Sequence, residues 1–266
     1  MTNMLEQIIL GIIQGIFEWL PISSEGVIVL IAKNFFEEQT LETIIKQALF
    51  LHLGTFLAAL IYFRKDVWSL LKTLFNYKSA EKDIQKIFKF LVISTLISSF
   101  LGFILFKVFS GFEEQLTLST KAITLIIGLL LLITGGLQIK ARTGQRKKAE
   151  ELNNKDGLLL GFMQGLSVLP GLSRSGLTVS ALLLRKFDET FALKLSFLMS
   201  LPIVLGGNIA LNLSKLEFSL PMICGLIFSF VFGLITIDLL LKIAKKINFG
   251  YFVLVFGILI IASLFV

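Results

Sequence analysis

The amino-acid sequence predicts an all-α integral membrane protein with six transmembrane helices and two re-entrant helical hairpins. Three observations support this fold class: the composition, six long apolar runs, and two shorter apolar stretches that are each broken in the middle. Apolar residues make up 55% of the 266 residues and charged residues 16%, whereas a soluble domain carries roughly 25% charge. Mean hydropathy is +0.87. This composition excludes a soluble nucleic-acid-binding protein, a disordered tail and a secreted disulfide-bonded domain.

Six apolar runs have the length of about 20 residues that a helix needs to cross a hydrocarbon core roughly 30 Å thick. They are residues 44–63, 86–108, 118–139, 190–212, 218–241 and 249–266. The N-terminus has no basic region before its first apolar stretch, so we expect no cleaved signal peptide. The single cysteine, Cys224, lies in an apolar run, where we expect it to pack as a small hydrophobic residue.

Lys and Arg are distributed unevenly among the connectors between these runs. Seven lie in residues 64–89, six in 140–155, two at 185–186 and three at 242–246, whereas the alternate connectors hold five. The positive-inside rule places the basic connectors in the cytoplasm. We therefore attribute most of the net charge of +7 to membrane topology, predict a multi-pass protein of the plasma membrane, and expect no nucleic-acid partner.

Two apolar stretches are too short on either side of a break to cross the membrane. Residues 4–32 are broken at LPISSEG, and residues 157–185 at LPGLSRSG. Each pair of arms can instead enter the membrane and return as a re-entrant hairpin. Irregular backbone at membrane depth is tolerated only where it is buried in protein or lines a wet cavity. Both breaks are therefore predicted to lie at a functional site.

The two hairpins are similar in sequence. At an offset of 150 residues, five residues of the first hairpin match identical residues of the second: Gly11, Gln14, Gly15, Ser23 and Gly26 match Gly161, Gln164, Gly165, Ser173 and Gly176. We therefore predict a single membrane domain, 1–266, made of repeat one (1–139), a basic cytoplasmic linker (140–156) and repeat two (157–266).

Each predicted repeat contains one hairpin and three spans. Because three is an odd number, repeat two is inverted in the membrane relative to repeat one. The first hairpin then enters from outside, the second enters from the cytoplasm, and their tips meet near the midplane. Inverted repeats with broken helices are typical of transporters, so transport is an alternative to catalysis.

Polar side chains gather at the two breaks, and polar groups inside apolar segments are candidates for function. The first hairpin supplies Gln14, Glu18, Ser23, Ser24 and Glu25, and the second supplies Ser173, Arg174, Ser175 and Thr178. This set suits a phosphate ester, because a guanidinium can hold two phosphate oxygens and helix N-termini favour anions. The structural alternatives are that Arg174 only pairs with Glu18, that serines serve close helix packing, and that Ser23 and Ser24 only cap a helix.

The segments GIIQGIFEWLPISSEG and LPGLSRSGLTVS, together with FLHLGTFLAALIYFRKD, resemble the undecaprenyl-diphosphate phosphatase family of the bacitracin-resistance type. The resemblance implies an outward-facing membrane enzyme that removes the terminal phosphate of a C55 polyprenyl diphosphate. Its product is the monophosphate lipid carrier used to build cell-envelope glycans. The partner is then a polyprenyl diphosphate lipid, and a homodimer is compatible with the sequence. The alternative function is a polyprenyl-phosphate transporter or flippase without hydrolysis.

The resemblance also implies roles for individual residues. Glu18, Ser24 and Arg174 match catalytic residues, and we add Glu25 as a hypothesis. The remaining matches are phosphate-binding: Gln14, Ser23, Ser173, Ser175 and Thr178. A divalent cation, Mg²⁺ or Ca²⁺, is implied at Glu18, with Gln14 and Glu25 as further candidate ligands.

Two positions depart from the family pattern. Gln14 stands where many members have Glu, and Val27 stands where most bacterial members have a histidine. Valine cannot transfer a proton, so we predict that either Ser24 attacks the phosphorus, or Glu18 or Glu25 activates a water. Glu25 either supplies the missing base or metal ligand, or is a solvated charge. The only histidine, His52, is expected to be a hydrogen-bonded structural residue; the alternative is that it reaches the site.

Overall fold

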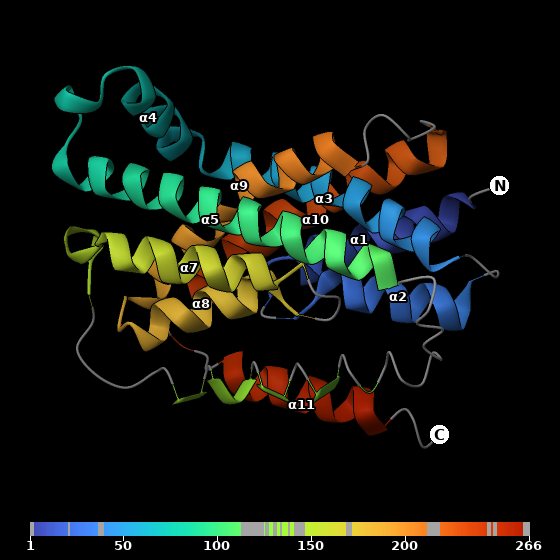
Figure 1. The fold of residues 1–266 in the computed structure, drawn as a ribbon. Helices are drawn as coiled ribbons and strands as arrows, with labels where there is room; N and C mark the ends of the chain where they lie inside the picture. Colours follow the sequence, from blue (N-terminus) through green and yellow to red (C-terminus); the bar gives the residue numbers. More distant parts are fainter. Residues whose placement is uncertain are drawn as a thin grey trace.

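The structure, a computed structural model, describes residues 3–20, 22–36, 40–112, 147–168, 172–211, 219–243, 246 and 249–262, with scattered residues between 125 and 140. These residues form α-helices and two short 3₁₀ turns, and no β-strand occurs among them. The prediction of an all-α protein is confirmed for this part of the chain. Figure 1 shows the helices running broadly side by side.

Four helices are long and apolar enough to cross a membrane. They are α3 (Leu41–Tyr62), α5 (Lys82–Phe112), α9 (Glu189–Leu211) and α10 (Leu220–Ile243). Each matches a predicted span to within a few residues, so the chain is a multi-pass membrane protein. The remaining two predicted spans are less complete. Most of 118–139 lies outside the described residues, and within 249–266 the structure describes α11 (Phe249–Ala262).

Both predicted breaks interrupt the helices. The first hairpin consists of α1 (Met4–Phe17) and α2 (Ser24–Phe35), and the second of α7 (Asn154–Leu166) and α8 (Arg174–Leu184). At 1.5 Å per residue these arms are roughly 16–21 Å long, shorter than the hydrocarbon core.

Two boundaries of the hairpins differ from the prediction. Helix α2 continues past residue 32 to Phe35, because the helical hydrogen bonds persist to the N–H of Phe36, which donates to the Ala32 carbonyl. Helix α7 begins inside the predicted linker, because the Asn153 side chain accepts from the N–H groups of Lys155 and Asp156 and caps the helix. Polar capping residues thus set the start of α7, where the prediction followed the apolar run.

The other described elements connect these helices. Helix α4 (Arg64–Phe75) and the 3₁₀ turn η1 (Tyr77–Ser79) join α3 to α5, and the 3₁₀ turn η2 (Ala149–Glu151) precedes α7. Helix α4 exposes Trp68 and Phe75. It lies in the connector that the positive-inside rule places in the cytoplasm.

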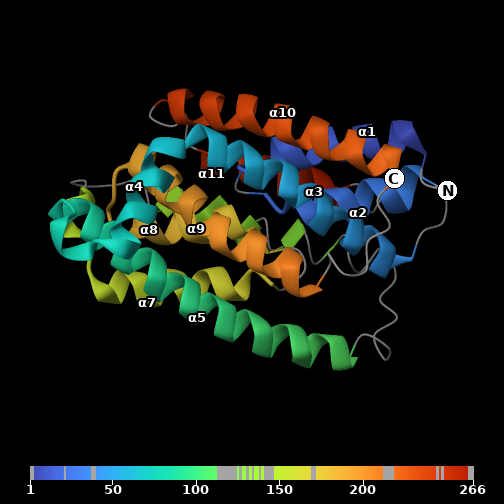
Figure 2. The ribbon, with the colours of Figure 1, turned by 90° about the horizontal axis from the view of Figure 1, so that it is seen from above.

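Glycines allow the first arm of each hairpin to pack closely against a long helix. A Cβ atom at Gly15 in α1 would lie 2.7 Å from the Cβ of Phe232 in α10, and one at Gly161 in α7 would lie 2.8 Å from the Ser94 carbonyl oxygen in α5. Small residues permit such close contacts between membrane helices. Figure 2 shows the two resulting pairs, α1 beside α10 and α7 beside α5.

A buried aromatic contact fixes the end of α1. Trp19 is 1% exposed, and its ring lies 4.7 Å from that of Phe197 in α9, in an edge-to-face arrangement. Phe63, at the end of α3, packs against the same ring. Rigid aromatic pairs of this kind add to the stabilisation from apolar burial. The preceding residue, Glu18, is thereby held at the boundary between the first hairpin and α9.

Candidate active site

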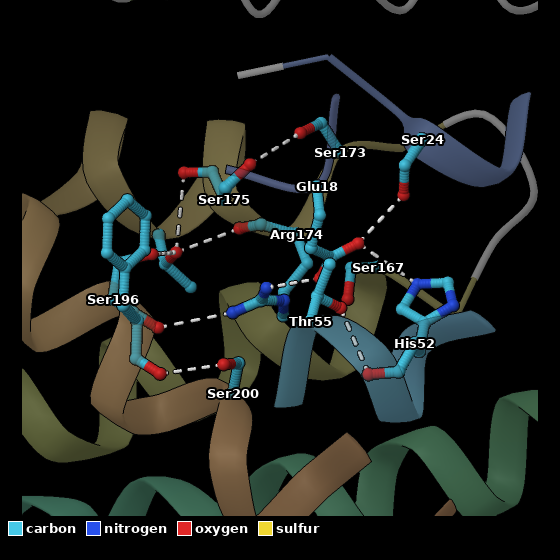
Figure 3. Close-up of polar contacts among 12 residues, drawn as sticks. Glu18, Ser24, His52, Thr55, Ser167, Ser173, Arg174, Ser175, Ser196 and Ser200 are labelled. Carbon is cyan, nitrogen blue, oxygen red and sulfur yellow. Dashed lines mark hydrogen bonds and ion pairs between the residues drawn. The ribbon is translucent and has the colours of Figure 1, made fainter. Parts of the chain in front are cut away.

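The carboxylate of Glu18 lies at the centre of the candidate site. The residue is 6% exposed. Its Oε2 accepts hydrogen bonds from Gln14 Nε2 at 2.9 Å and from Ser24 Oγ at 2.8 Å. Its Oε1 lies 2.6 Å from Arg174 Nη2, and His52 Nε2 lies 3.1 Å from Oε2. Figure 3 shows Ser24, His52 and Arg174 converging on this carboxylate.

Arg174 brings the second hairpin to this centre. It is the first residue of α8, and its side chain is 12% exposed. While Nη2 donates to Glu18, Nη1 donates to the carbonyl of Ser196 in α9 at 3.2 Å. Buried charges need a partner, and this ion pair gives one to both Glu18 and Arg174. The predicted pairing of Arg174 with Glu18 is therefore present, and it joins the tips of the two hairpins.

The hydroxyls at the site fall into two groups. Ser23 and Ser173 are N-caps, because their Oγ atoms accept from the N–H of Gly26 at 3.1 Å and of Gly176 at 3.0 Å. The helix-capping alternative stated for Ser23 is therefore present in the structure, and Ser173 caps its helix in the same way. Ser24, by contrast, is the first residue of α2 and directs its hydroxyl at Glu18.

The remaining predicted hydroxyls also bind protein groups. Ser175 donates to the Leu20 carbonyl at 2.5 Å and contacts Ser173 at 3.1 Å. Thr178 donates to the Arg174 carbonyl and lies 2.6 Å from the hydroxyl of Ser196. The structure thus gathers every predicted hydroxyl around the two helix starts, and it adds Ser196, which the sequence analysis missed.

Glu25 and Val27 differ in what they face. Glu25 is half-buried and interacts electrostatically with Glu18 and His52, yet its carboxylate makes no hydrogen bond with any described residue. Val27 is 6% exposed and packs with Ile22 in an apolar cluster. Val27 therefore belongs to the packing of α2. Glu25 lies at the margin of the polar centre, which is Glu18 with the side chains that contact it: Gln14, Ser24, His52 and Arg174.

His52 occupies a more central place than the sequence analysis expected. It lies in α3, outside both hairpins. Its Nδ1 lies 2.6 Å from the Ala48 carbonyl oxygen, which agrees with a hydrogen-bonded role, but its Nε2 contacts Glu18. The available signal was the presence of an ionisable residue inside an apolar span, which is a functional candidate by default.

The side chains do not fit a resident metal ion. Among the described residues, no three His, Cys, Asp or Glu side chains are close enough to hold one. Glu18 already accepts from Gln14 and Ser24 on one oxygen and pairs with Arg174 through the other. Mg²⁺ usually binds through one or two carboxylates together with waters and substrate phosphates, and Ca²⁺ takes six to eight oxygen ligands, so both require carboxylate oxygens that are not already engaged. We therefore derive no step through a metal, and the cation at Glu18, Gln14 and Glu25 stays a prediction.

A comparison with protein families identifies the chain. The model of the bacitracin resistance protein BacA matches residues 7–262. This chain belongs to the BacA family. The match includes both hairpins and every residue of the polar centre, so the resemblance noted in the sequence is confirmed over almost the whole chain.

Curated relatives are similar to this chain over nearly their full length. A protein of Methanococcoides burtonii is 43% identical over 100% of both chains. A protein of Methanothrix thermoacetophila is 36% identical, and one of Haloarcula marismortui is 35% identical, each over 97% of this chain and 96% of the relative. All three bear the name undecaprenyl-diphosphatase.

Proposed function

We propose that this BacA-family protein is an undecaprenyl-diphosphate phosphatase, which hydrolyses the lipid diphosphate to the monophosphate and inorganic phosphate. The observation that carries the proposal is the contact of Glu18 with both Ser24 and Arg174. A hydroxyl, a carboxylate that can take its proton, and a guanidinium that can bind phosphate occur together in one buried centre. The names of the relatives support the same reaction.

Ser24 is the proposed nucleophile. Its hydroxyl donates to Glu18 Oε2 at 2.8 Å, which is the geometry that a general base needs to accept the proton. In the first step, Ser24 Oγ forms a bond to the terminal phosphorus, and its proton passes to Glu18. The bond from that phosphorus to the bridging oxygen breaks, and the lipid monophosphate leaves. The leaving monophosphate takes the proton from Glu18. In the second step, Glu18 accepts a proton from the water that attacks the phosphoserine. The bond from phosphorus to Ser24 Oγ breaks, Ser24 Oγ takes up that proton, and inorganic phosphate is released.

Arg174 is proposed to stabilise the charge on the transferring phosphoryl group. Its two hydrogen bonds to Glu18 and the Ser196 carbonyl leave three of the five guanidinium N–H donors. The N-termini of α2 and α8 add positive partial charge at the same place. Donors that are held in position before the reaction stabilise developing charge without reorganisation. We therefore assign the binding of the terminal phosphate to Arg174.

The membrane arrangement extends this proposal. We infer that α1–α2 and α7–α8 are re-entrant hairpins within two inverted repeats and six spans, as the sequence predicts. The packing of α1 on α10 and of α7 on α5 supports it, because each hairpin then contacts a long helix of the other repeat. With the basic connectors in the cytoplasm, we propose that the site faces outward and that the isoprenoid chain stays in the bilayer.

Transport without hydrolysis is the competing function. The contact between Ser24 and Glu18 favours hydrolysis, because a carrier that only binds a phosphate has no need for a base beside a hydroxyl. A carboxylate at the centre also opposes the binding of an anion. The presence of the carboxylate is therefore explained by proton transfer rather than by lipid binding alone.

The proposed function is tested by phosphate release from undecaprenyl diphosphate with purified protein in detergent. We expect release by the wild type and its loss in Arg174→Ala. Parallel reactions with Mg²⁺, with Ca²⁺ and with a chelator test the predicted cation. If the folded wild type binds the lipid through Arg174 but releases no phosphate, the enzyme assignment is wrong and the carrier is favoured.

A further inference from the structure

Among the described residues whose side chains contact the Glu18 carboxylate, His52 alone comes from a long membrane-spanning helix. It lies in the middle of α3, whose described span runs from Glu42 to Tyr62. An ionisable side chain at such a depth is costly to bury. The contact with Glu18 gives it a specific partner, and the sequence holds no other histidine.

The backbone fixes which nitrogen of His52 carries a proton. Nδ1 lies 2.6 Å from the Ala48 carbonyl oxygen. Because a carbonyl can only accept, Nδ1 is the donor in this hydrogen bond. The ring is therefore held in one orientation by its own helix, and Nε2 is left to face Glu18.

The remaining nitrogen of His52 must share a proton with Glu18. Nε2 lies 3.1 Å from Oε2, and two lone pairs would repel each other at that distance. One proton therefore bridges the two atoms, whichever atom holds it. This hydrogen bond acts on the same oxygen that accepts from Ser24, while Arg174 holds the other oxygen. The carboxylate is thus held from both sides.

We propose that His52 is a positioning residue, which holds Glu18 so that Oε2 faces the Ser24 hydroxyl. The inference rests on the proposed phosphatase function, because it assigns Glu18 the task of accepting the proton of Ser24. It does not require His52 to touch the phosphate. Because His52 lies in α3, the orientation of the Glu18 carboxylate depends on a helix outside both hairpins.

Steady-state kinetics of two variants test this role. His52→Leu removes the hydrogen bond, and we expect kcat to fall about 10- to 100-fold, as for the loss of other orienting partners. We expect KM to change less than twofold, because Arg174 and the hydroxyls still bind the phosphate. His52→Gln keeps a side-chain N–H donor, and we expect it to restore kcat to within about fivefold of the wild type.

Gln47→Leu is the matched control for His52→Leu. Gln47 is also a buried polar residue of α3, 4% exposed, and its Oε1 has no hydrogen-bond partner among the described residues. We expect its kcat to match the wild type. The positioning role is wrong if His52→Leu keeps the wild-type kcat, or if it raises KM alone. It is also wrong if His52→Gln is as slow as His52→Leu, because the imidazole itself would then be needed.

A measurement without substrate separates this inference from the phosphatase proposal. With ¹⁵N-labelled histidine, the single imidazole gives one pair of nitrogen resonances, whatever the activity. We expect a protonated Nδ1, and an Nε2 resonance that moves in Glu18→Gln but not in the exposed control Glu81→Gln. An Nε2 resonance with the same chemical shift in Glu18→Gln as in the wild type would contradict the contact between His52 and Glu18. Absence of phosphate release by the wild type would instead contradict the proposed function.

Discussion

The two hairpins share a scaffold but differ in their charged residues. In both, a serine caps the second helix, Ser23 in α2 and Ser173 in α8. The residue after each cap differs: Ser24 in the first hairpin corresponds to Arg174 in the second. Glu18 likewise has an apolar counterpart, Val168, which is 40% exposed. The first hairpin thus supplies the carboxylate, and the second supplies the guanidinium.

A glutamine that both hairpins share shows how the surroundings of a side chain decide its role. Gln14 and Gln164 occupy equivalent, buried positions. Gln14 donates to Glu18, whereas Gln164 donates to the hydroxyl of Ser98 in α5 at 3.1 Å. The same side chain therefore supports the candidate site in one hairpin and helix packing in the other. Both hairpins provide a helix start that favours anions, and the proposed chemistry depends on residues that only one hairpin carries.

Of the substitutions that test this difference between the hairpins, Ser24→Ala should cause the largest loss of activity. Removal of a nucleophile should lower kcat by about 10⁴-fold or more. The neighbouring Ser23→Ala is the control, since it removes an N-cap worth about 1 kcal/mol of stability and should lower the melting temperature with a smaller change in kcat. Phosphate release and thermal unfolding measure the two effects. A fall of only tenfold in Ser24→Ala would favour attack by water.

Arg174→Lys should lower kcat by about 10³-fold, because one ammonium cannot reproduce the fork that binds Glu18 and the Ser196 carbonyl together. Arg185→Lys is the matched control for Arg174→Lys. Arg185 ends the same helix and pairs with the buried Asp156 through Nε at 2.7 Å, so we expect its activity to stay within threefold. Equal losses in both variants would mean that the helix, rather than the phosphate contact, is affected.

Glu18→Gln should lower kcat by about 100-fold through loss of the general base. Glu25→Gln should cost less than about tenfold, since the Glu25 carboxylate makes no hydrogen bond with a described residue and base catalysis is assigned to Glu18. Both variants are compared by initial rates of phosphate release. A larger loss in Glu25→Gln would reassign the base to Glu25, which is the alternative that the sequence leaves open.

The smallest effect on catalysis should come from the glycines that the hairpins share. Gly15→Ala and Gly165→Ala place a Cβ atom 2.7 Å from Phe232 Cβ and 2.9 Å from Leu101 Cβ, so both should destabilise by about 1–3 kcal/mol through overpacking. Gly206→Ala has no atom within 4 Å and should be neutral or stabilising. Thermal unfolding in one detergent measures all three. If all three variants have the same melting temperature, the first arms of the two hairpins, α1 and α7, are not closely packed.

Much of the fold followed from the sequence, because apolar length and interrupted helices are local signals. The four described spans and both breaks were predicted this way. The approach of Glu18 to Arg174 was predicted through the repeat, which places the two tips together. Ser196 was not predicted, and a place for His52 at the site was only the alternative to a structural role, because both depend on how α3 and α9 rotate against the hairpins. That rotation is set by contacts such as Trp19 on Phe197, which no local pattern specifies.

The most direct test of a shared catalytic centre is a double-mutant cycle on phosphate release from undecaprenyl diphosphate. It compares the wild type, Glu18→Gln, Arg174→Lys and the double variant. Residues that act as one unit have non-additive effects, so we predict that the double variant is about as slow as the slower single variant. If the two losses multiply instead, the tips of the hairpins act independently, and the account of one centre built by both is wrong.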